Sequence, residues 1–170
     1  ANITENIVWG GGFKELYDDE GISGNIGNDM TPEFCARLGA AFSGVRKGDI
    51  LLGYGENPAL EMLGVGFASG AASTGADVYI SCRCPYNAFR YSVANFGFSG
   101  GAYIRAHGER AVITLISSDG FDISRNDERK ISAAFSRDDF TRASADEISE
   151  IKSFSNIIRL YESALINYAK

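Results

Sequence analysis

The only histidine of the chain, His107, lies between two arginines, Arg105 and Arg110. An imidazole changes its charge near neutral pH, so it can act as a general base or accept a phosphoryl group. Guanidinium groups on either side could steady an anion, because arginine pairs well with phosphate oxygens. Gly108 follows directly, and a histidine beside a glycine is also typical of a tight turn. The residues therefore suggest a catalytic His107 with an anion site, or a plain turn residue.

A second candidate site is the loop from Tyr54 to Asn57, which follows an apolar run and precedes a predicted helix. Ligands of open α/β sheets bind beyond the carboxyl ends of the strands. The glycines of this loop are a weak phosphate signal, since no dinucleotide fingerprint or Walker lysine follows. Tyr54 and Asn57 are therefore candidate ligand-binding residues, and an ordinary strand-to-helix turn is the alternative.

Two further clusters are candidates for a reactive or metal site. Cys84 precedes a predicted helix, where a thiol can be activated, although an inert structural thiol is the alternative. Cys82 and Cys84 have a poor spacing for zinc, and His107 is the only imidazole that could join them. The acidic run 18–20 could hold a cation or form a solvated turn. We expect no metal site in this chain.

The composition limits the class of protein. The chain has 170 residues, 45% hydrophobic and 22% charged, which suits one domain with a sizeable core. Its net charge of −6, with scattered basic residues, argues against a nucleic-acid partner. No apolar run reaches the roughly 20 residues that cross a bilayer, and the start lacks the pattern of a signal peptide. Three cysteines, an odd number without a disulfide framework, favour a reducing cytoplasm.

The candidate residues depend on a series of predicted helices and strands. A helix over 28–43 is favoured by Thr31 as N-cap and Pro32 at the first helical position. Gly64, Gly66 and Gly70 in a helix over 58–73 suggest close packing against a neighbour. Further helices are predicted over 86–96 and 125–135, and strands over 49–54, 77–82, 101–106 and 111–117.

The order of these elements predicts the fold. The connection 107–110 is too short for a parallel crossover, so the last two strands must be antiparallel neighbours. We therefore predict a three-layer α/β/α domain with a mixed, mostly parallel four-stranded core sheet whose last strand is antiparallel. The domain is expected to span residues 1–150, followed at 151–170 by a polar linker and an amphipathic helix over 156–168. That helix would dock on another domain or subunit, or pack on its own sheet.

Four segments, in order, resemble the first domain of the α-D-phosphohexomutases, the phosphomannomutase and phosphoglucomutase family. GISGNIGNDMTPE looks like the family's GIRGxxGxxLTPE opening, and DILLGYGENPALEML is similar to its VxVGRDTRxSSxxL strand and loop. GFASGAASTGADVYISCRCPYNAFRYSV resembles GxxxxGxxVxxxGxxPTPxxxYAV, and GGAYIRAHGERAVITLISSDG takes the place of GIxITASHNPxxYNGxKxxxxxG. The resemblance covers roughly residues 12 to 165.

The signature residues of the family are replaced in this chain. The arginine of GIRG falls on Ser23, the Arg-Asp of RDTR on Tyr54 and Gly55, its second arginine on Asn57, and the Thr-Pro of PTP on Tyr86 and Asn87. The serine that carries the phosphate in active members falls on His107, its neighbouring histidine on Gly108, and the loop is shortened. Arg105 and Arg110 are the nearest remaining cations.

The resemblance implies a parent activity of phosphoryl transfer on hexose phosphates, with Mg²⁺ as the cofactor of complete members. It implies that the metal-binding aspartates and sugar-selecting loops belong to further domains, so this chain is a fragment of a longer protein or a standalone remnant. The replacements imply an inactive domain whose partners are those further domains or another protein. A divergent enzyme that uses His107 as phosphoacceptor, and a module that binds a hexose phosphate without turnover, are the alternatives.

Overall fold

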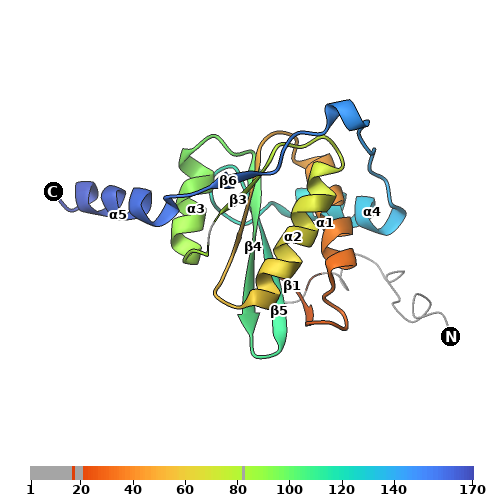
Figure 1. Cartoon of the computed structure of the whole chain (residues 1–170), viewed down its shortest axis with the longest axis horizontal. Helices are drawn as coiled ribbons and strands as arrows, with labels where there is room; N and C mark the ends of the chain where they lie inside the picture. Colours follow the sequence, from red (N-terminus) through yellow and green to blue (C-terminus); the bar gives the residue numbers. More distant parts are fainter. Residues whose placement is uncertain (1–16, 18–20, 82) are drawn as a thin grey trace.

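The computed structural model describes residue 17 and residues 21–81 and 83–170. The acidic run 18–20 and Cys82 lie outside the described residues. The described chain folds around a six-stranded sheet with helices on both faces (Figure 1). The strands are β1 Ile22–Asn25, β2 Ile50–Tyr54, β3 Val78–Ser81, β4 Gly100–His107, β5 Arg110–Ser117 and β6 Lys152–Phe154. The helices are α1 Pro32–Val45, α2 Pro58–Ala72, α3 Tyr86–Asn95, α4 Arg125–Arg137, η3 Ala145–Glu147 and α5 Ile157–Tyr168.

The sheet has the order β1-β5-β4-β2-β3-β6. Strand β2 pairs in parallel with β3 and β4, and β3 pairs in parallel with β6. Strand β5 is antiparallel to both of its neighbours, β4 and β1. The prediction of a mixed, mostly parallel sheet with an antiparallel hairpin is confirmed.

The predicted number of strands is corrected from four to six. The two missed strands, β1 and β6, are the edges of the sheet and have four and three residues. Their sequences, ISGN and KSF, are short and partly polar, as edge strands often are. A strand that buries so little apolar surface leaves no alternating hydrophobic pattern to detect. Strand β6 also lies inside the segment expected to be a polar linker.

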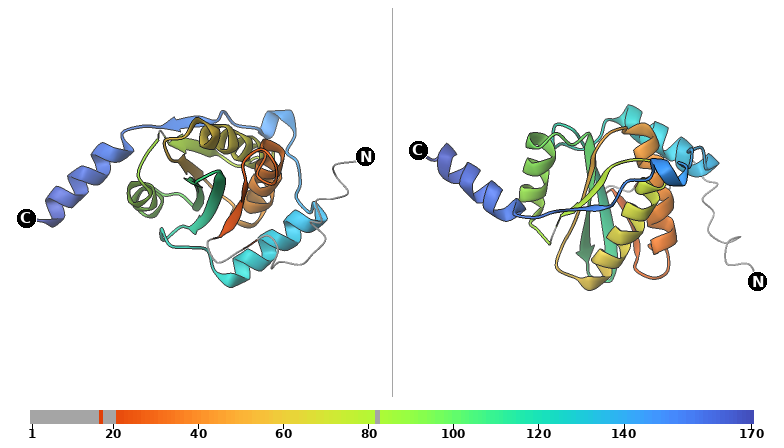
Figure 2. Two further views of the ribbon diagram at one scale, coloured as in Figure 1. Left: turned by 90° about the horizontal axis from the view of Figure 1, so that it is seen from below. Right: turned by 45° about the horizontal axis from the view of Figure 1, so that its top comes forward.

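Helices cover the two faces of the sheet unequally (Figure 2). One face packs against α1, α2 and α4 and holds the larger core, in which Phe42, Phe67 and Phe135 are buried. The other face packs against α3, and its smaller core includes Phe89, Tyr103 and the first residue of α5, Ile157. This three-layer arrangement confirms the predicted fold class.

Helices α1 and α2 pack so closely that glycine is required between them. A Cβ atom at Gly70 would overlap the carbonyl group of Ala36, and one at Gly39 would overlap the carbonyl oxygen of Phe67. A Cβ at Gly66 would lie 2.8 Å from the carbonyl oxygen of Pro32. Glycine has a low helix propensity, but at these positions it allows the backbones of the two helices to approach closely, as predicted.

Helix α1 has a well-defined start. The hydroxyl of Thr31 accepts a hydrogen bond from the backbone N–H of Phe34 at 3.2 Å, and Pro32 occupies the first helical position. The helix therefore begins at Pro32 rather than at the predicted residue 28, and it continues past Gly44 to Val45.

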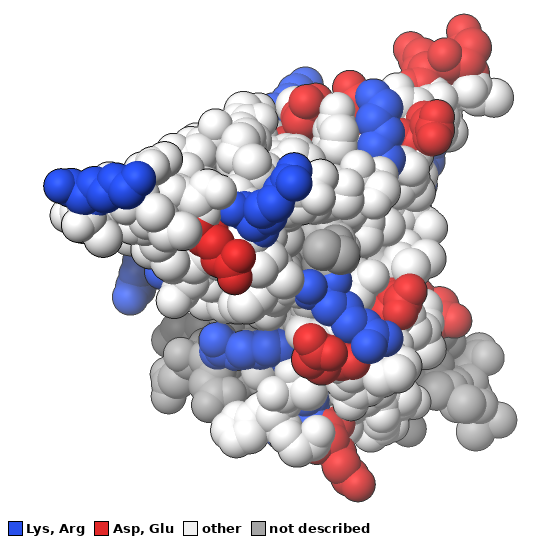
Figure 3. All heavy atoms as spheres, turned by 60° about the vertical axis from the view of Figure 1, so that its left-hand side comes forward, with Lys and Arg blue, Asp and Glu red and all other residues white. Residues whose placement is uncertain are grey.

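The last helix, α5, leaves the body of the domain (Figures 1 and 2). Its first turns contact α3, where the rings of Tyr161 and Tyr91 lie 5.7 Å apart. Beyond them, Leu165 is 51% and Ile166 is 59% exposed. Figure 3 shows basic and acidic side chains scattered over this side of the molecule. Among the described helices, none has the length and apolar content needed to cross a membrane.

Candidate functional site

The position of His107 is set by a tight hairpin. Strand β4 ends at His107 and β5 begins at Arg110, and these two residues pair across the ladder. Only Gly108 and Glu109 connect them, and Gly108 has a φ of 62°. A two-residue hairpin needs such a positive φ, which glycine adopts without a steric penalty. His107 is therefore the exposed last residue of a strand, and the turn that follows it has only two residues.

Four predicted site residues share one face of the sheet. Arg105 pairs with Val112, which pairs in turn with Ser23 on β1, and His107 pairs with Arg110. Opposite residues of antiparallel strands point to the same side, and so do residues two apart along a strand. Ser23, Arg105, His107 and Arg110 thus lie together at the carboxyl end of β4.

One direct contact joins two of these residues. The Nη2 atom of Arg110 donates a hydrogen bond to the hydroxyl oxygen of Ser23 at 2.7 Å. This bond ties the edge strand β1 to β5 and orients the guanidinium group across the sheet. The sequence placed these two residues in different motifs, and their contact follows from the antiparallel pairing of the two strands.

Tyr54 and Asn57 are not brought to this face. Tyr54 is only 7% exposed and belongs to the larger core with Leu52 and Ile104, on the opposite side of the sheet. Asn57 caps α2, and its side-chain oxygen accepts a hydrogen bond from the N–H of Ala59 at 2.9 Å. Both residues have structural roles in the fold.

A cavity of about 430 Å³ adjoins the face on the side of Arg105. Its lining includes Arg105, Tyr86 and Asp122. Burial and the nearby carboxylate of Asp122 raise the pKa of Tyr86, while Arg90 and Arg105 oppose the shift. Sequence reasoning missed Tyr86 and Asp122 as neighbours of Arg105. The available signal was that Tyr86 falls on the threonine of the family's Thr-Pro motif.

Cys84 is buried at the start of α3. Its Sγ atom lies 3.5 Å from the hydroxyl oxygen of Ser81, and its carbonyl oxygen accepts a hydrogen bond from the hydroxyl of Tyr103 at 2.7 Å. With 5% exposure, this environment is that of a structural thiol rather than a reactive one.

The described residues do not fit a magnesium site. Hard divalent cations bind clustered carboxylate and carbonyl oxygens. Within residues 17, 21–81 and 83–170, no group of three or more His, Cys, Asp or Glu residues could hold a metal ion. The face around His107 carries arginines instead, and guanidinium groups do not bind a divalent cation.

Comparisons with known proteins agree with this architecture. The family model for the α/β/α domain I of phosphoglucomutase/phosphomannomutase matches residues 14–142. The phosphoglucomutase/phosphomannomutase of Thermococcus kodakarensis is 30% identical over 162 residues, which are 90% of this chain and 35% of that protein. The phosphoglucosamine/phosphogalactosamine mutase of Sulfurisphaera tokodaii is 27% identical over 161 residues, 91% of this chain and 35% of that protein.

Solved structures share the fold at low sequence identity. A structure from Thermus thermophilus superposes with a TM-score of 0.75 at 17% identity, over 89% of this chain and 35% of that one. A phosphoglucomutase/phosphomannomutase family protein from Burkholderia thailandensis gives a TM-score of 0.71 at 14% identity, over 86% of this chain and 34% of that one.

The chain thus forms a three-layer α/β/α domain whose candidate site lies at the carboxyl end of β4. The chain belongs to the phosphoglucomutase/phosphomannomutase family, in which it corresponds to domain I. It spans about a third of the length of the curated relatives it matches, 35% in the first two.

Proposed function

We propose that this chain is a non-catalytic domain I of a phosphohexomutase-type protein. The parent family acts on sugar phosphates, and this domain keeps the fold without the parts that accept a phosphoryl group. The observation that carries the proposal is the two-residue turn between His107 and Arg110.

A phosphoacceptor site needs more than one reactive side chain. It must present a nucleophile, surround a nearly dianionic phosphate with donors, and keep those donors in place during transfer. At the family's serine position this chain has His107, which ends a strand beside a turn too short to wrap a phosphate. The turn supplies only two backbone N–H groups, those of Gly108 and Glu109.

The cationic field is also reduced. By resemblance, three arginines are replaced by Ser23, Tyr54 and Asn57, and Tyr54 is buried while Asn57 caps a helix. Losing one well-placed donor costs about 3–4 kcal/mol of transition-state stabilisation in other enzymes. Losing several together leaves too little stabilisation for turnover.

Intact mass spectrometry at neutral pH tests the proposal. The protein is incubated with glucose 1,6-bisphosphate and Mg²⁺, which would transfer one phosphoryl group to a competent histidine and release a hexose monophosphate. We expect no mass gain in the wild-type protein or in His107→Ala. An acid-labile gain of one phosphoryl group that is absent from His107→Ala would refute the proposal in favour of a divergent enzyme.

Non-covalent binding of a hexose phosphate is a second candidate function. It is favoured by the placement of Ser23, Arg105 and Arg110 on one face of the sheet. A ligand that binds only the folded state raises the melting temperature. A thermal-shift titration with glucose 6-phosphate and mannose 6-phosphate should give a shift that Arg105→Gln abolishes if this function is present, and a flat response at millimolar ligand if it is absent.

The proposed setting is a reducing cytoplasm, and the free thiol of the buried Cys35 supports it. The proposed partners are the remaining domains of a longer chain or a separate protein. The exposed apolar side chains of α5 support such a contact.

A further inference from the structure

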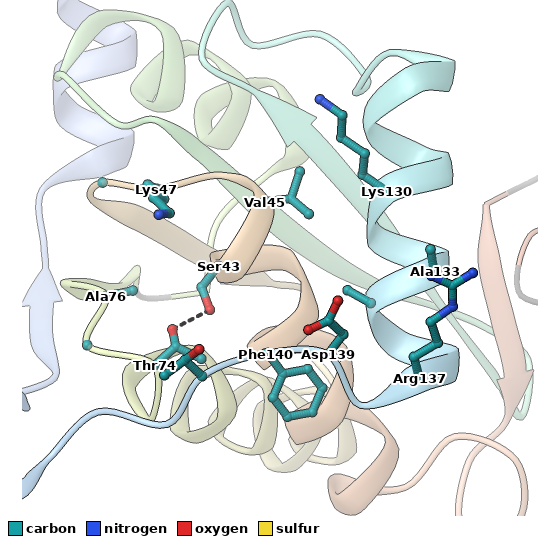
Figure 4. A pocket seen from close by; sticks show the side chains of 15 residues that line it. Ser43, Val45, Lys47, Thr74, Ala76, Lys130, Ala133, Arg137, Asp139 and Phe140 are labelled. Atoms are coloured by element: carbon teal, nitrogen blue, oxygen red, sulfur yellow. Dashed lines mark hydrogen bonds between the residues drawn. The ribbon is translucent and has the colours of Figure 1, made fainter.

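A groove of about 810 Å³ lies next to the amino ends of β2 and β3, at the end of the sheet opposite to the His107 hairpin. Figure 4 shows the side chains that line it. One wall is the end of α1 with the loop to β2, and the other is the C-terminal half of α4. The turn after α2 and the segment 139–141 close its base. None of the residues of the candidate site at the hairpin lines this groove.

Basic side chains dominate the rim of the groove. Lys47 rises from the wall formed by the end of α1, and Lys130 and Arg137 rise from α4 (Figure 4). Beside them, Arg142 donates a hydrogen bond to the hydroxyl of Ser73 and stacks 4.7 Å above the ring of Phe140. Three cations therefore line the groove, and Arg142 lies next to it over Phe140, in a chain whose net charge is −6.

These charges are poorly balanced by nearby carboxylates. Asp139 is the acidic residue in the lining of the groove. The ion pairs among the described residues use Arg37, Arg46 and Arg83, and none of them includes Lys47, Lys130 or Arg137. The rim thus keeps a local positive charge that an anionic partner could neutralise.

The floor between the cations is partly apolar. Val45, Ala76, Ala134 and Phe140 contribute half-buried apolar surface, and Ser43 and Thr74, whose hydroxyl oxygens lie 2.7 Å apart, contribute polar surface (Figure 4). Burying more of this surface would be favourable at about 25 cal/mol per Å². The floor therefore suits a ligand that carries apolar groups between its anionic ones.

The distance between the cations indicates how long a ligand must be to contact them together. Lys130 and Arg137 are seven residues apart on α4, so they emerge about 10 Å apart along the helix axis. A single phosphate or carboxylate cannot contact both charges at that separation. Several carboxylates along a peptide can, because an extended chain advances about 3.3 Å per residue.

We propose that this groove is a docking site for an acidic peptide segment of a partner protein. Glutamate or aspartate side chains of the partner pair with Lys47, Lys130 and Arg137, and apolar side chains between them cover Val45 and Phe140. The proposal is independent of the chemistry at the hairpin.

Stabilisation of α4 is a different role that the same cations can have. Basic residues stabilise the C-terminal ends of helices, and Arg137 lies in the last turn of α4. If that were their whole role, removing them would lower the melting temperature and leave peptide binding unaffected.

Fluorescence anisotropy with the full chain provides the test. The probe is a fluorescein-labelled peptide of about eight residues that alternates glutamate and leucine, which spans about 27 Å when extended. The variant Lys130→Gln/Arg137→Gln removes two rim charges. The matched control, Arg125→Gln/Arg129→Gln, removes the same charge from exposed positions of α4 that do not line the groove.

We expect saturable binding that weakens about five- to tenfold in Lys130→Gln/Arg137→Gln and stays near wild-type in the control, as expected for the loss of two exposed ion pairs. Binding should also weaken with rising salt, and a glutamine–leucine peptide should not bind. Absence of saturable binding, an equal loss in both variants, or full displacement by inorganic phosphate at constant ionic strength would each overturn the proposal.

Discussion

At the scale of single residues, several of the predicted site residues make contacts that stabilise the fold. Ser23 and Arg110 hold an edge strand through a 2.7 Å hydrogen bond, and Asn57 caps a helix. Tyr54 fills the core under α2, where a Cβ atom at Gly64 would lie 3.1 Å from its ring. Positions that the resemblance associates with phosphate are thus occupied by side chains with hydrogen-bonding or packing roles.

Because Cys35 is buried as a neutral thiol, we expect the free energy of unfolding to decrease at alkaline pH. Burial, and secondarily the charge of Glu33, raises the pKa of this thiol from 9.0 to about 12. The folded state therefore keeps a proton that the unfolded state loses. The stabilising effect is complete below pH 9 and is lost as the pH rises from there toward 12.

Urea midpoints measured between pH 7 and 11 should accordingly fall above about pH 9. Burial also raises the pKa of Tyr103 to about 12, so Cys35→Ala should remove part of the slope and leave the rest. A slope in Cys35→Ala equal to that of the wild type would contradict the assigned role of the thiol.

At the scale of elements, the contact between α1 and α2 is the most constrained part of the fold. Gly70→Ala places a methyl group against the backbone of Ala36, and neither helix can move without losing the packing of Phe67. We expect the free energy of unfolding to drop by about 2–3 kcal/mol, despite a gain in helix propensity of about 1 kcal/mol. Chemical denaturation measures the change. The exposed neighbour Ser69→Ala is the control, with an expected change within about 0.5 kcal/mol; equal effects would disprove the close contact.

Helix α5 should be anchored at its start and unsupported at its end. Ile157 is fully buried, so Ile157→Ala should lower the free energy of unfolding by about 2–4 kcal/mol. Leu165 is 51% exposed, so Leu165→Ala should change it by no more than about 0.5 kcal/mol. Denaturant unfolding of both variants checks this contrast, and a large effect at Leu165 would mean that the helix folds back onto the domain.

Much of this element structure was predictable from the sequence, and the exceptions share a cause. Long helices and central strands have periodic apolar faces, so their positions follow from the pattern. Strands β1 and β6 bury too little surface to show one. The opposite placement of Tyr54 and Arg105 depends on which face each strand presents, and that register is set only when strands pair.

At the scale of the whole molecule, the two ends of the central strands carry different features. The carboxyl end of β4, where the family resemblance predicts chemistry, leads into the tight His107–Arg110 hairpin. The opposite end of these strands carries a groove with a cationic rim that the motifs of the sequence did not reveal, because its residues come from three separate segments, 43–48, 74–76 and 130–141. These segments are distant in the sequence and become neighbours only when the chain folds.

The central claim is that the tight turn and missing cations, and not the loss of a hydroxyl alone, prevent phosphoryl acceptance. His107→Ser restores a hydroxyl at the family's serine position while leaving the hairpin in place. After long incubation of this variant with glucose 1,6-bisphosphate and Mg²⁺, intact mass spectrometry should show an unmodified chain. A stable gain of one phosphoryl group, mapped to residue 107 by peptide analysis, would contradict the account.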